Sequence, residues 1–429
     1  MLKINRIRNI SESFITYDYF CSKEIRKYFT KNDFFVEYIS IDTTKVPNHI
    51  KIIPFLANVA PISWFAGFDI QIDDIDECFY KSLMAIKEQF KRFYPTLVKP
   101  DTQIKYNNLI KTEYSTNKFA MLFSGGLDAF TTYFRHRDEN LDLITIHGAD
   151  ISIGDIKQWS NVVSYNENEP IIAQNKKYYI KSNLRDFYSF EVDKLLPDFG
   201  WWGYIQHGLS LTAINAPLAY LNGYKKIYIA SSQTRIAGYK IIPWGSMPEI
   251  DNKVAWAKTI VINDGEDLTR QEKTAMVVAV AEKISDKVNL RVCYSDNNNS
   301  LNCSTCEKCI RTSFGIMIAG GNPNSYGFNV DISIYQKVKA IVSNGFKSAG
   351  GQLIWKSILD YMLSNDIFFI FEQKDVELQK YNEIIDILKV QTNAEIKKTT
   401  NYQKIKLNII SKYPKLFNKY LMLRKKLKK

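Results

Sequence analysis

The sequence predicts an α/β protein whose central unit is a parallel β-sheet. Short apolar runs typical of buried strands alternate there with helical or loop stretches, as in a parallel sheet covered by helices on both faces. The strand-like runs lie at residues 119–123, 143–146, 177–180 and 226–230. A chain of 429 residues can fill more than one core. We therefore expect an N-terminal α+β accessory domain (1–115), the parallel-sheet domain (116–318) and a C-terminal helical region (319–429).

The N-terminal segment combines a strand pattern at residues 34–41 with a helical pattern at residues 78–93. Between them, residues 52–68 form an uncharged stretch of 17 residues. Pro54 and Pro61 interrupt this stretch, and it is shorter than the roughly 20 apolar residues that a membrane span needs. We expect a buried, irregular segment there and no transmembrane segment in the chain.

The loop at residues 123–128 reads Phe-Ser-Gly-Gly-Leu-Asp and joins the first central strand to a helix that begins near Asp128. Paired glycines allow a backbone in which successive N–H groups converge, and the N-terminus of the helix adds positive potential. Ser124, Gly125 and Gly126 therefore predict a phosphate cradle, with ATP as its natural ligand. The alternative is a tight strand-to-helix turn without a ligand.

Four of the six cysteines lie in one short segment, with the pattern Cys-x9-Cys-x2-Cys-x2-Cys. They are Cys293, Cys303, Cys306 and Cys309. Four thiolates form a closed tetrahedral site that suits structural Zn²⁺, and an iron–sulfur cluster is the alternative because ferredoxin-like runs share the double x2 spacing. Nothing at the N-terminus resembles a signal peptide, so we expect reduced thiols and a cytoplasmic location.

The net charge of +12 is concentrated at the end of the chain. Residues from Lys397 onward hold 12 of the 57 Lys and Arg residues and no acidic residue, so the rest of the chain is balanced. Beyond Pro414, apolar residues recur at helical spacing and predict a basic amphipathic helix. Such a helix fits an acidic partner, a nucleic acid or an anionic membrane surface. It equally fits a terminal helix packed on the body with a solvated basic face.

The loop and the cysteine segment together resemble the PP-loop ATP pyrophosphatase superfamily, and within it the 7-cyano-7-deazaguanine synthase family. The resemblance rests on Ser-Gly-Gly-Leu-Asp at residues 124–128 and on Cys-x2-Cys-x2-Cys followed by Arg311, and it covers about residues 119–314. It implies an adenine nucleotide alpha hydrolase-like fold of Rossmann type. The chain departs from the family pattern at Ala129, where the family has Ser, so one phosphate-facing hydroxyl group is missing.

The resemblance also implies roles for individual residues. Ser124 and Asp128 would be catalytic, with Asp128 organising the loop or a Mg²⁺ ion. ATP would be bound by Ser124, Gly125, Gly126, Leu127, Asp128, Arg270 and Lys273, and Zn²⁺ by the four cysteines. Independently of the resemblance, His147 follows a central strand at the edge where parallel sheets bind ligands. His147 and His207 are therefore candidate catalytic residues, with packed structural histidines as the alternative.

The reaction that the resemblance implies is the adenylation of a carboxylic acid. The acid attacks the α-phosphate of ATP, pyrophosphate leaves, and a nitrogen nucleophile then displaces AMP. The acid is a small molecule such as a deazaguanine acid, and relatives in anti-phage defence operons imply a macromolecular acceptor, either a protein or a nucleic acid. Two other functions stay open: a transfer-RNA-modifying enzyme that grips RNA with the basic tail, and a non-catalytic nucleotide-binding protein, which Ala129 permits.

Overall fold

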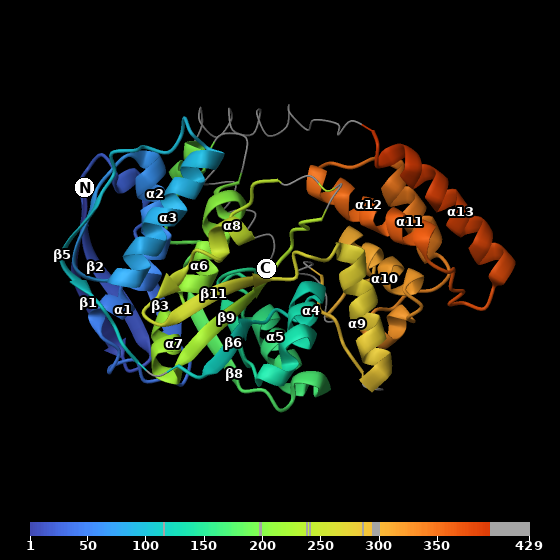
Figure 1. Cartoon of the computed structure of the whole chain (residues 1–429), viewed down its shortest axis with the longest axis horizontal. Coiled ribbons are helices and arrows are strands. Elements are labelled where there is room, and N and C mark those ends of the chain that lie inside the picture. The colour runs from blue at the N-terminus through green and yellow to red at the C-terminus, as the bar shows by residue number, and fades with distance from the viewer. Residues whose placement is uncertain are drawn as a thin grey trace.

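The computed structural model describes residues 1–114, 116–196, 200–236, 239, 242–284, 287–293 and 301–394. The basic helix predicted after Pro414 lies outside these residues. Within them, eleven strands form one mostly parallel sheet with helices on both faces, which confirms the predicted α/β class (Figure 1). The strand order is β10-β11-β9-β6-β7-β8-β3-β2-β1-β4-β5.

The central part of this sheet is Rossmann-like. Its parallel strands are β6 (Lys118–Leu122), β7 (Asp142–His147), β8 (Lys177–Ser182), β9 (Tyr224–Ala230) and β11 (Thr259–Asp264). The first of them in the chain, β6, lies in the middle, with β7 and β8 on one side and β9 and β11 on the other. The first four strands confirm the four predicted runs, and β11 is an addition to them. The order in which successive strands are added to the sheet therefore reverses between β6 and β9. Doubly wound sheets bind ligands at this position.

Side chains of the central strands alternate between two hydrophobic cores, one on each face of the sheet. On β6, Ala120 belongs to the first core and Met121 to the second, and on β7 the same holds for Ile144 and Leu143. The first core includes α6, α7 and α8, and the second includes α4, α5 and α9. These helices are α4 (Leu127–His136), α5 (Ile156–Asn168), α6 (His207–Ala213), α7 (Ala216–Asn222), α8 (Pro248–Asp251) and α9 (Arg270–Ile284).

The N-terminal segment extends the same sheet. Its strands are β1 (Leu2–Ser11), β2 (Phe14–Cys21), β3 (Phe35–Tyr38), β4 (Ile70–Asp76) and β5 (Ile104–Ile110), and the short β10 (Ala255–Trp256) forms the other edge. Its helices are α1 (Asn48–Lys51), α2 (Ile53–Ala66) and α3 (Glu77–Phe93). β3 pairs antiparallel with β8, with Val36 opposite Ser182. The segments on the two sides of the predicted boundary near residue 115 therefore share one sheet and one core, and the division into three domains stays a prediction.

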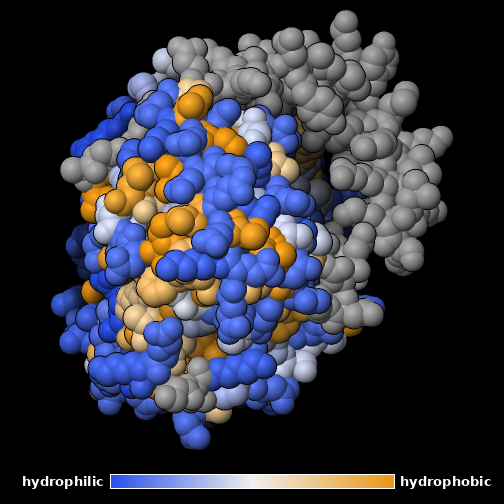
Figure 2. Space-filling model, turned by 90° about the vertical axis from the view of Figure 1, so that its right-hand side faces the viewer, coloured by the Kyte–Doolittle hydropathy of each residue, from blue (hydrophilic) through white to orange (hydrophobic). Residues whose placement is uncertain are grey.

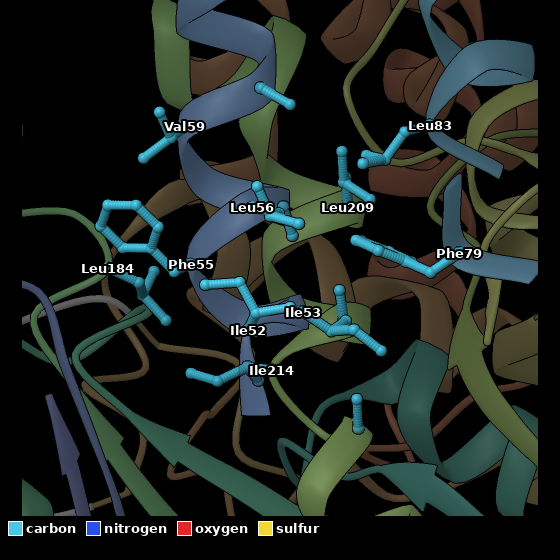
Figure 3. Packing of buried hydrophobic residues seen from close by; sticks show 14 of the residues in the cluster. Ile52, Ile53, Phe55, Leu56, Val59, Phe79, Leu83, Leu184, Leu209 and Ile214 are labelled. Atoms are coloured by element: carbon cyan, nitrogen blue, oxygen red, sulfur yellow. The ribbon is translucent and has the colours of Figure 1, made fainter. Parts of the chain in front are cut away.

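Residues 52–68 are buried, as expected, but they are helical rather than irregular. Nearly all of α2 is inaccessible to solvent. Pro54 lies in the first turn, where a missing N–H breaks no helical bond, and the burial of apolar side chains outweighs the bond that Pro61 removes from the interior. Figure 3 shows side chains of α2 packed among those of α3 and α6, for example Leu56 beside Leu209.

The described chain ends in helices that confirm the helical character predicted for this region. In the predicted region from residue 319 onward they are α11 (Ile334–Ser343), α12 (Ala349–Ser364) and α13 (Lys374–Gln391), and α10 (Glu307–Ile318) directly precedes that region. They belong to the second core and gather on the right in Figure 1. On the face beside α13, apolar side chains form patches between hydrophilic ones (Figure 2). In the part of the chain that the structure describes, no helix is long and apolar enough to cross a membrane.

A buried polar network around Asn58 tests the packing of α2 on α6. The Asn58 side chain accepts hydrogen bonds from Gln206 Nε2 at 2.6 Å and Ser210 Oγ at 2.8 Å, and donates to the Pro54 carbonyl at 2.8 Å. Asn58→Ala removes the acceptor of Ser210 Oγ and leaves Gln206 Nε2 only the Asn58 backbone carbonyl at 3.5 Å, so we expect a loss of about 2–4 kcal/mol in the free energy of unfolding, measured by chemical denaturation. The matched variant Asn107→Ala, on the exposed edge strand β5, should change it by less than about 0.5 kcal/mol. Equal losses in both variants would contradict this role.

Candidate functional site

The predicted phosphate loop joins β6 to α4 in the centre of the sheet. Gly125 has φ +72°, in the left-handed region, and a Cβ atom there would lie 2.5 Å from Tyr165 Cε1. Both the backbone and this contact therefore require glycine. Gly126 is the N-cap residue of α4, and its amide donates to Ser124 Oγ at 3.3 Å. Because the first N–H groups of a helix have no helical acceptor, the loop and the start of α4 offer donors to a ligand.

The loop lines a cavity of about 850 Å³. The cavity lies at the carboxyl ends of β6, β7 and β9, where the strand order changes direction, and its wall includes Ala149 and Ser232 from the segments after β7 and β9. Its position and size fit a small-molecule site of an open α/β sheet. Ser124, which is exposed, and Leu127, which is buried, both contribute to the wall.

Cationic side chains gather in the cavity beside the loop: Arg270, Arg291, Lys308 and Arg311. Arg311 is only 7% exposed. It donates to Glu307 at 2.6 Å, while its Nε has no hydrogen-bond partner among the described residues. Burial, together with the charges of Arg270 and Arg311, lowers the pKa of Lys308 to about 8. Positive charges held this close together favour an anionic ligand such as a polyphosphate.

Asp128, the last residue of the motif, is held by the two predicted cations of α9. Its carboxylate pairs with the Arg270 guanidinium, and its other oxygen lies 3.6 Å from Lys273 Nζ. Burial raises the pKa of Asp128, but the charges of Arg270 and Lys273 outweigh this and hold the pKa below its usual value. Lys273 is buried and also donates to the Ser231 carbonyl at 2.5 Å, whereas Arg270 lines the cavity. Asp128 thus ties α4 to α9 and orients Arg270.

A second part of the cavity is aromatic. A π-helical turn carries Trp202 and Tyr204 to the wall, and Tyr204 packs edge-on against Trp244 with ring centroids 4.9 Å apart. The Arg185 guanidinium lies 4.8 Å from the centroid of the Trp202 ring. The predicted candidate His207 also lines this part; burial lowers its pKa, and its Nδ1 has no hydrogen-bond partner among the described residues. These side chains provide a flat apolar surface together with a charged and a basic group.

His147, the other predicted histidine, is not part of the cavity wall. It ends β7, is 1% exposed, and stacks on Trp159 with ring centroids 4.4 Å apart. Its Nε2 donates to the Ser152 carbonyl at 3.1 Å. Burial also lowers the pKa of His147. These contacts favour the structural interpretation of this residue.

The four predicted cysteine ligands come together. Cys293 Sγ and Cys306 Sγ are 3.9 Å apart, Cys303 Sγ and Cys309 Sγ are 3.8 Å apart, and all four sulfur atoms lie within 4.8 Å of one another. A tetrahedral zinc ion with Zn–S bonds of about 2.3 Å places its sulfurs about 3.8 Å apart. Cys303 Sγ also accepts amide hydrogen bonds from Thr305 at 3.5 Å and Cys306 at 3.2 Å, which stabilise a thiolate. The cluster could therefore bind a metal such as zinc.

The sulfur distances also bear on the iron–sulfur alternative. A [4Fe–4S] cluster holds each thiolate on a different iron, and a [2Fe–2S] cluster divides the four thiolates between two irons, so in both the four sulfurs stand farther apart as a set than the ligands of a single ion. The compact arrangement of the four cysteines therefore fits one tetrahedral ion better.

Several cavity residues are additions to the predicted site. Lys308 flanks a cysteine in the Cys-x2-Cys-x2-Cys phrase, and Arg291 precedes Cys293 by two positions. No local pattern in the sequence predicts that the cysteine segment lies beside the phosphate loop, since the two are far apart along the chain. Arg185 and the aromatic residues carry no motif, and only the folded backbone brings them to the cavity.

Comparisons of the chain with protein-family models, with curated proteins and with solved structures found no match. The family resemblance therefore rests on the loop and the cysteine segment. The structure adds that these two motifs meet in space, because Ser124 and Cys293 line the same cavity.

A buried carboxyl group lies behind the cavity wall. Asp251, at the end of α8, is fully buried, and its Oδ2 accepts hydrogen bonds from Ser246 Oγ at 2.8 Å and Asn263 Nδ2 at 2.7 Å. Burial raises the pKa of Asp251 to about 7. Ser246 lines the cavity, so its hydrogen bond links the Asp251 carboxyl group to the cavity wall.

We expect Asp251→Asn to remove a pH-dependent loss of stability. Because the folded-state pKa is raised, the proton on Asp251 stabilises the fold fully below about pH 4, and this stabilisation is lost as the pH rises through about 7. The complete loss is roughly 4 kcal/mol. In thermal unfolding, the variant should melt several degrees above the parent at pH 8 and gain less at pH 5. The exposed control Asp73→Asn should shift at neither pH, and a lower melting temperature of Asp251→Asn at pH 8 would contradict the account.

Metal analysis of the purified protein tests the cysteine cluster. We expect about one zinc ion per chain, since four thiolates fill a closed tetrahedral site. Cys306→Ser should lower the zinc content at least tenfold under chelator competition, on the order of the affinity that one thiolate ligand provides. The control Cys78→Ser, whose thiol lies outside the cluster, should retain zinc. Iron in place of zinc, or equal metal content in both variants, would contradict the assignment.

Proposed function

We propose that this chain is an adenylate-forming enzyme of the PP-loop ATP pyrophosphatase type, similar to 7-cyano-7-deazaguanine synthase. The observation that carries the proposal is the phosphate loop itself: Ser124 and Gly126, on either side of the left-handed Gly125, face a cationic cavity together with the start of α4, at the position where open α/β sheets bind ligands. The four-cysteine cluster beside the same cavity supports it, because the resemblance joins these two motifs.

The residues of the loop bind the polyphosphate of ATP in this proposal. The amides at the start of α4 donate hydrogen bonds to phosphate oxygens, and Ser124 Oγ adds a hydroxyl donor. Arg270 and Arg311 neutralise the pyrophosphate as it leaves. Asp128 acts by orienting Arg270, so its role is to organise the loop rather than to hold a metal ion.

Mg²⁺ and Zn²⁺ enter the proposal in different ways. Among the described residues, the cavity wall includes the carboxylates of Asp128 and Asp150. Since Asp128 is already paired with two cations, Mg²⁺ would be held mainly by phosphate oxygens and water, as is common for this ion, and would share the phosphate charge. Zn²⁺ would be structural, with all four positions filled by cysteines.

The acid substrate occupies the aromatic part of the cavity in this proposal. Its carboxylate oxygen forms a bond to the α-phosphorus while the bond to pyrophosphate breaks. A nitrogen nucleophile then attacks the carbonyl carbon and AMP leaves. His207 fits the role of accepting the proton that the nitrogen gives up, because burial lowers its pKa and its Nδ1 has no partner among the described residues.

Calorimetric titration with ATP and Mg²⁺ tests the binding half of the proposal. Arg270→Gln should weaken ATP binding by roughly tenfold or more, the size expected for losing one charge-assisted hydrogen bond. The matched control Arg137→Gln, exposed at the end of α4, should bind ATP as the parent does. Absence of ATP binding by the parent protein contradicts the proposal. The catalytic half predicts AMP and pyrophosphate as products with a deazaguanine acid and ammonium, whereas ADP and phosphate would exclude it.

A further inference from the structure

Arg291 connects the cysteine cluster to the phosphate loop. Its backbone amide donates to the Gly125 carbonyl at 2.7 Å, and its side-chain Nε donates to the Ser124 carbonyl at 2.9 Å. In a planar peptide the carbonyl and the next amide point in opposite directions. One residue that holds two consecutive carbonyls therefore also sets the directions of the amides of Gly125 and Gly126, which belong to the candidate phosphate site.

The Asn302 side chain holds Arg291 in place from the side of the cysteines. Its Nδ2 donates at 2.6 Å to the carbonyl one residue before Arg291, and its Oδ1 accepts at 3.0 Å from the amide one residue after it. Asn302 directly precedes Cys303, and Cys293 follows Arg291 by two positions. Asn302 and Arg291 therefore each lie within two residues of a candidate metal ligand.

Tyr165 makes a second link between the same two segments. Its ring lies against Gly125, where a Cβ atom would meet it at 2.5 Å. Its hydroxyl donates to the Asn289 carbonyl at 2.5 Å, and Asn289 Nδ2 donates to Glu169 at 2.9 Å. Residues 287–293 form neither a helix nor a strand, so these side-chain contacts, together with the cysteine cluster, determine where Arg291 lies.

We propose that Arg291 is a positioning residue that transmits metal binding at the four cysteines to the phosphate loop. An ion held by all four thiolates joins Cys293 to the segment that contains Asn302. This fixes the two Asn302 hydrogen bonds to the backbone on either side of Arg291. When the ion is absent, this link between the two segments is lost, and the amides of Gly125 and Gly126 are free to reorient. Metal and polyphosphate binding are then coupled, and the coupling is reciprocal. The inference rests on the proposed function for the identity of the ligand, but the order of the loop can be measured without any nucleotide.

Hydrogen exchange of the full-length protein, read by mass spectrometry, tests this coupling. Metal removal by a chelator, and Arg291→Ala in the metal-loaded protein, should each raise amide exchange at residues 124–130 by roughly tenfold while β6 stays protected. The hydrogen-bonded amides of this segment include Gly126, which donates to Ser124 Oγ, and Phe130, which donates to the Gly126 carbonyl. Metal content is measured for each sample. Chelation of Arg291→Ala should add no further increase, because both changes act on one connection. The matched control Arg137→Ala should behave as the parent does, including its response to the chelator.

Three results would overturn the proposal. Unchanged loop exchange after metal removal would mean that the two sites are independent. An equal rise in β6 would mean that the ion supports the whole fold. A further rise on chelation of Arg291→Ala would mean that the ion acts by another route.

Nucleotide binding provides a second readout. In the metal-loaded protein, Arg291→Ala should weaken ATP binding by roughly tenfold and leave adenosine binding unchanged, since only the phosphates contact the loop. Arg291→Lys keeps the charge but lacks Nε, so it should restore part of the ATP affinity and none of the loop protection; full restoration of both would overturn the positioning role. If the parent protein binds no ATP, the proposed function fails, while the exchange experiment still decides this inference.

Discussion

The left-handed backbone at Gly125 is the constraint on which the rest of the site depends. It lets the chain leave β6 and enter α4 within a few residues while its carbonyls face Arg291. A Cβ atom at this position would clash with the Tyr165 ring, so only glycine fits between the loop and Tyr165. Ser124 and Gly126, the residues on either side of Gly125, line the cavity, and the cations of α9 and α10 lie in the same wall.

The same arrangement explains why distant segments meet at one place. Asp128 forms ion pairs with Arg270 and Lys273 of α9, and the turn before α10 brings the cysteines close to Arg291. Each of these contacts places a positive charge or a donor near the loop, and a polyphosphate offsets the mutual repulsion of these charges. A ligand-free turn would not need such a concentration of cations, so the charges argue for the binding interpretation of the loop.

Local patterns predict the elements that depend on local sequence. The apolar runs that became β6 to β9, the glycine loop and the cysteine spacing could all be read in advance, because strand burial, left-handed glycine and metal ligation each leave a short signature. Residues 52–68 were harder, because prolines argue against a helix and only tertiary burial outweighs them. The pairing of β3 with β8, the ion pairs of Asp128 and the contacts of Arg291 depend on residues far apart in the chain, and no single segment reports them.

A crystal structure of the zinc-loaded protein with Mg²⁺ and a nonhydrolysable ATP analogue tests the central claim most directly. The account predicts that the phosphates lie on the amides at the start of α4, with Arg270 in contact with them and Arg291 still holding the carbonyls of Ser124 and Gly125. A nucleotide bound elsewhere, or a loop whose amides are covered by neighbouring side chains, would contradict it.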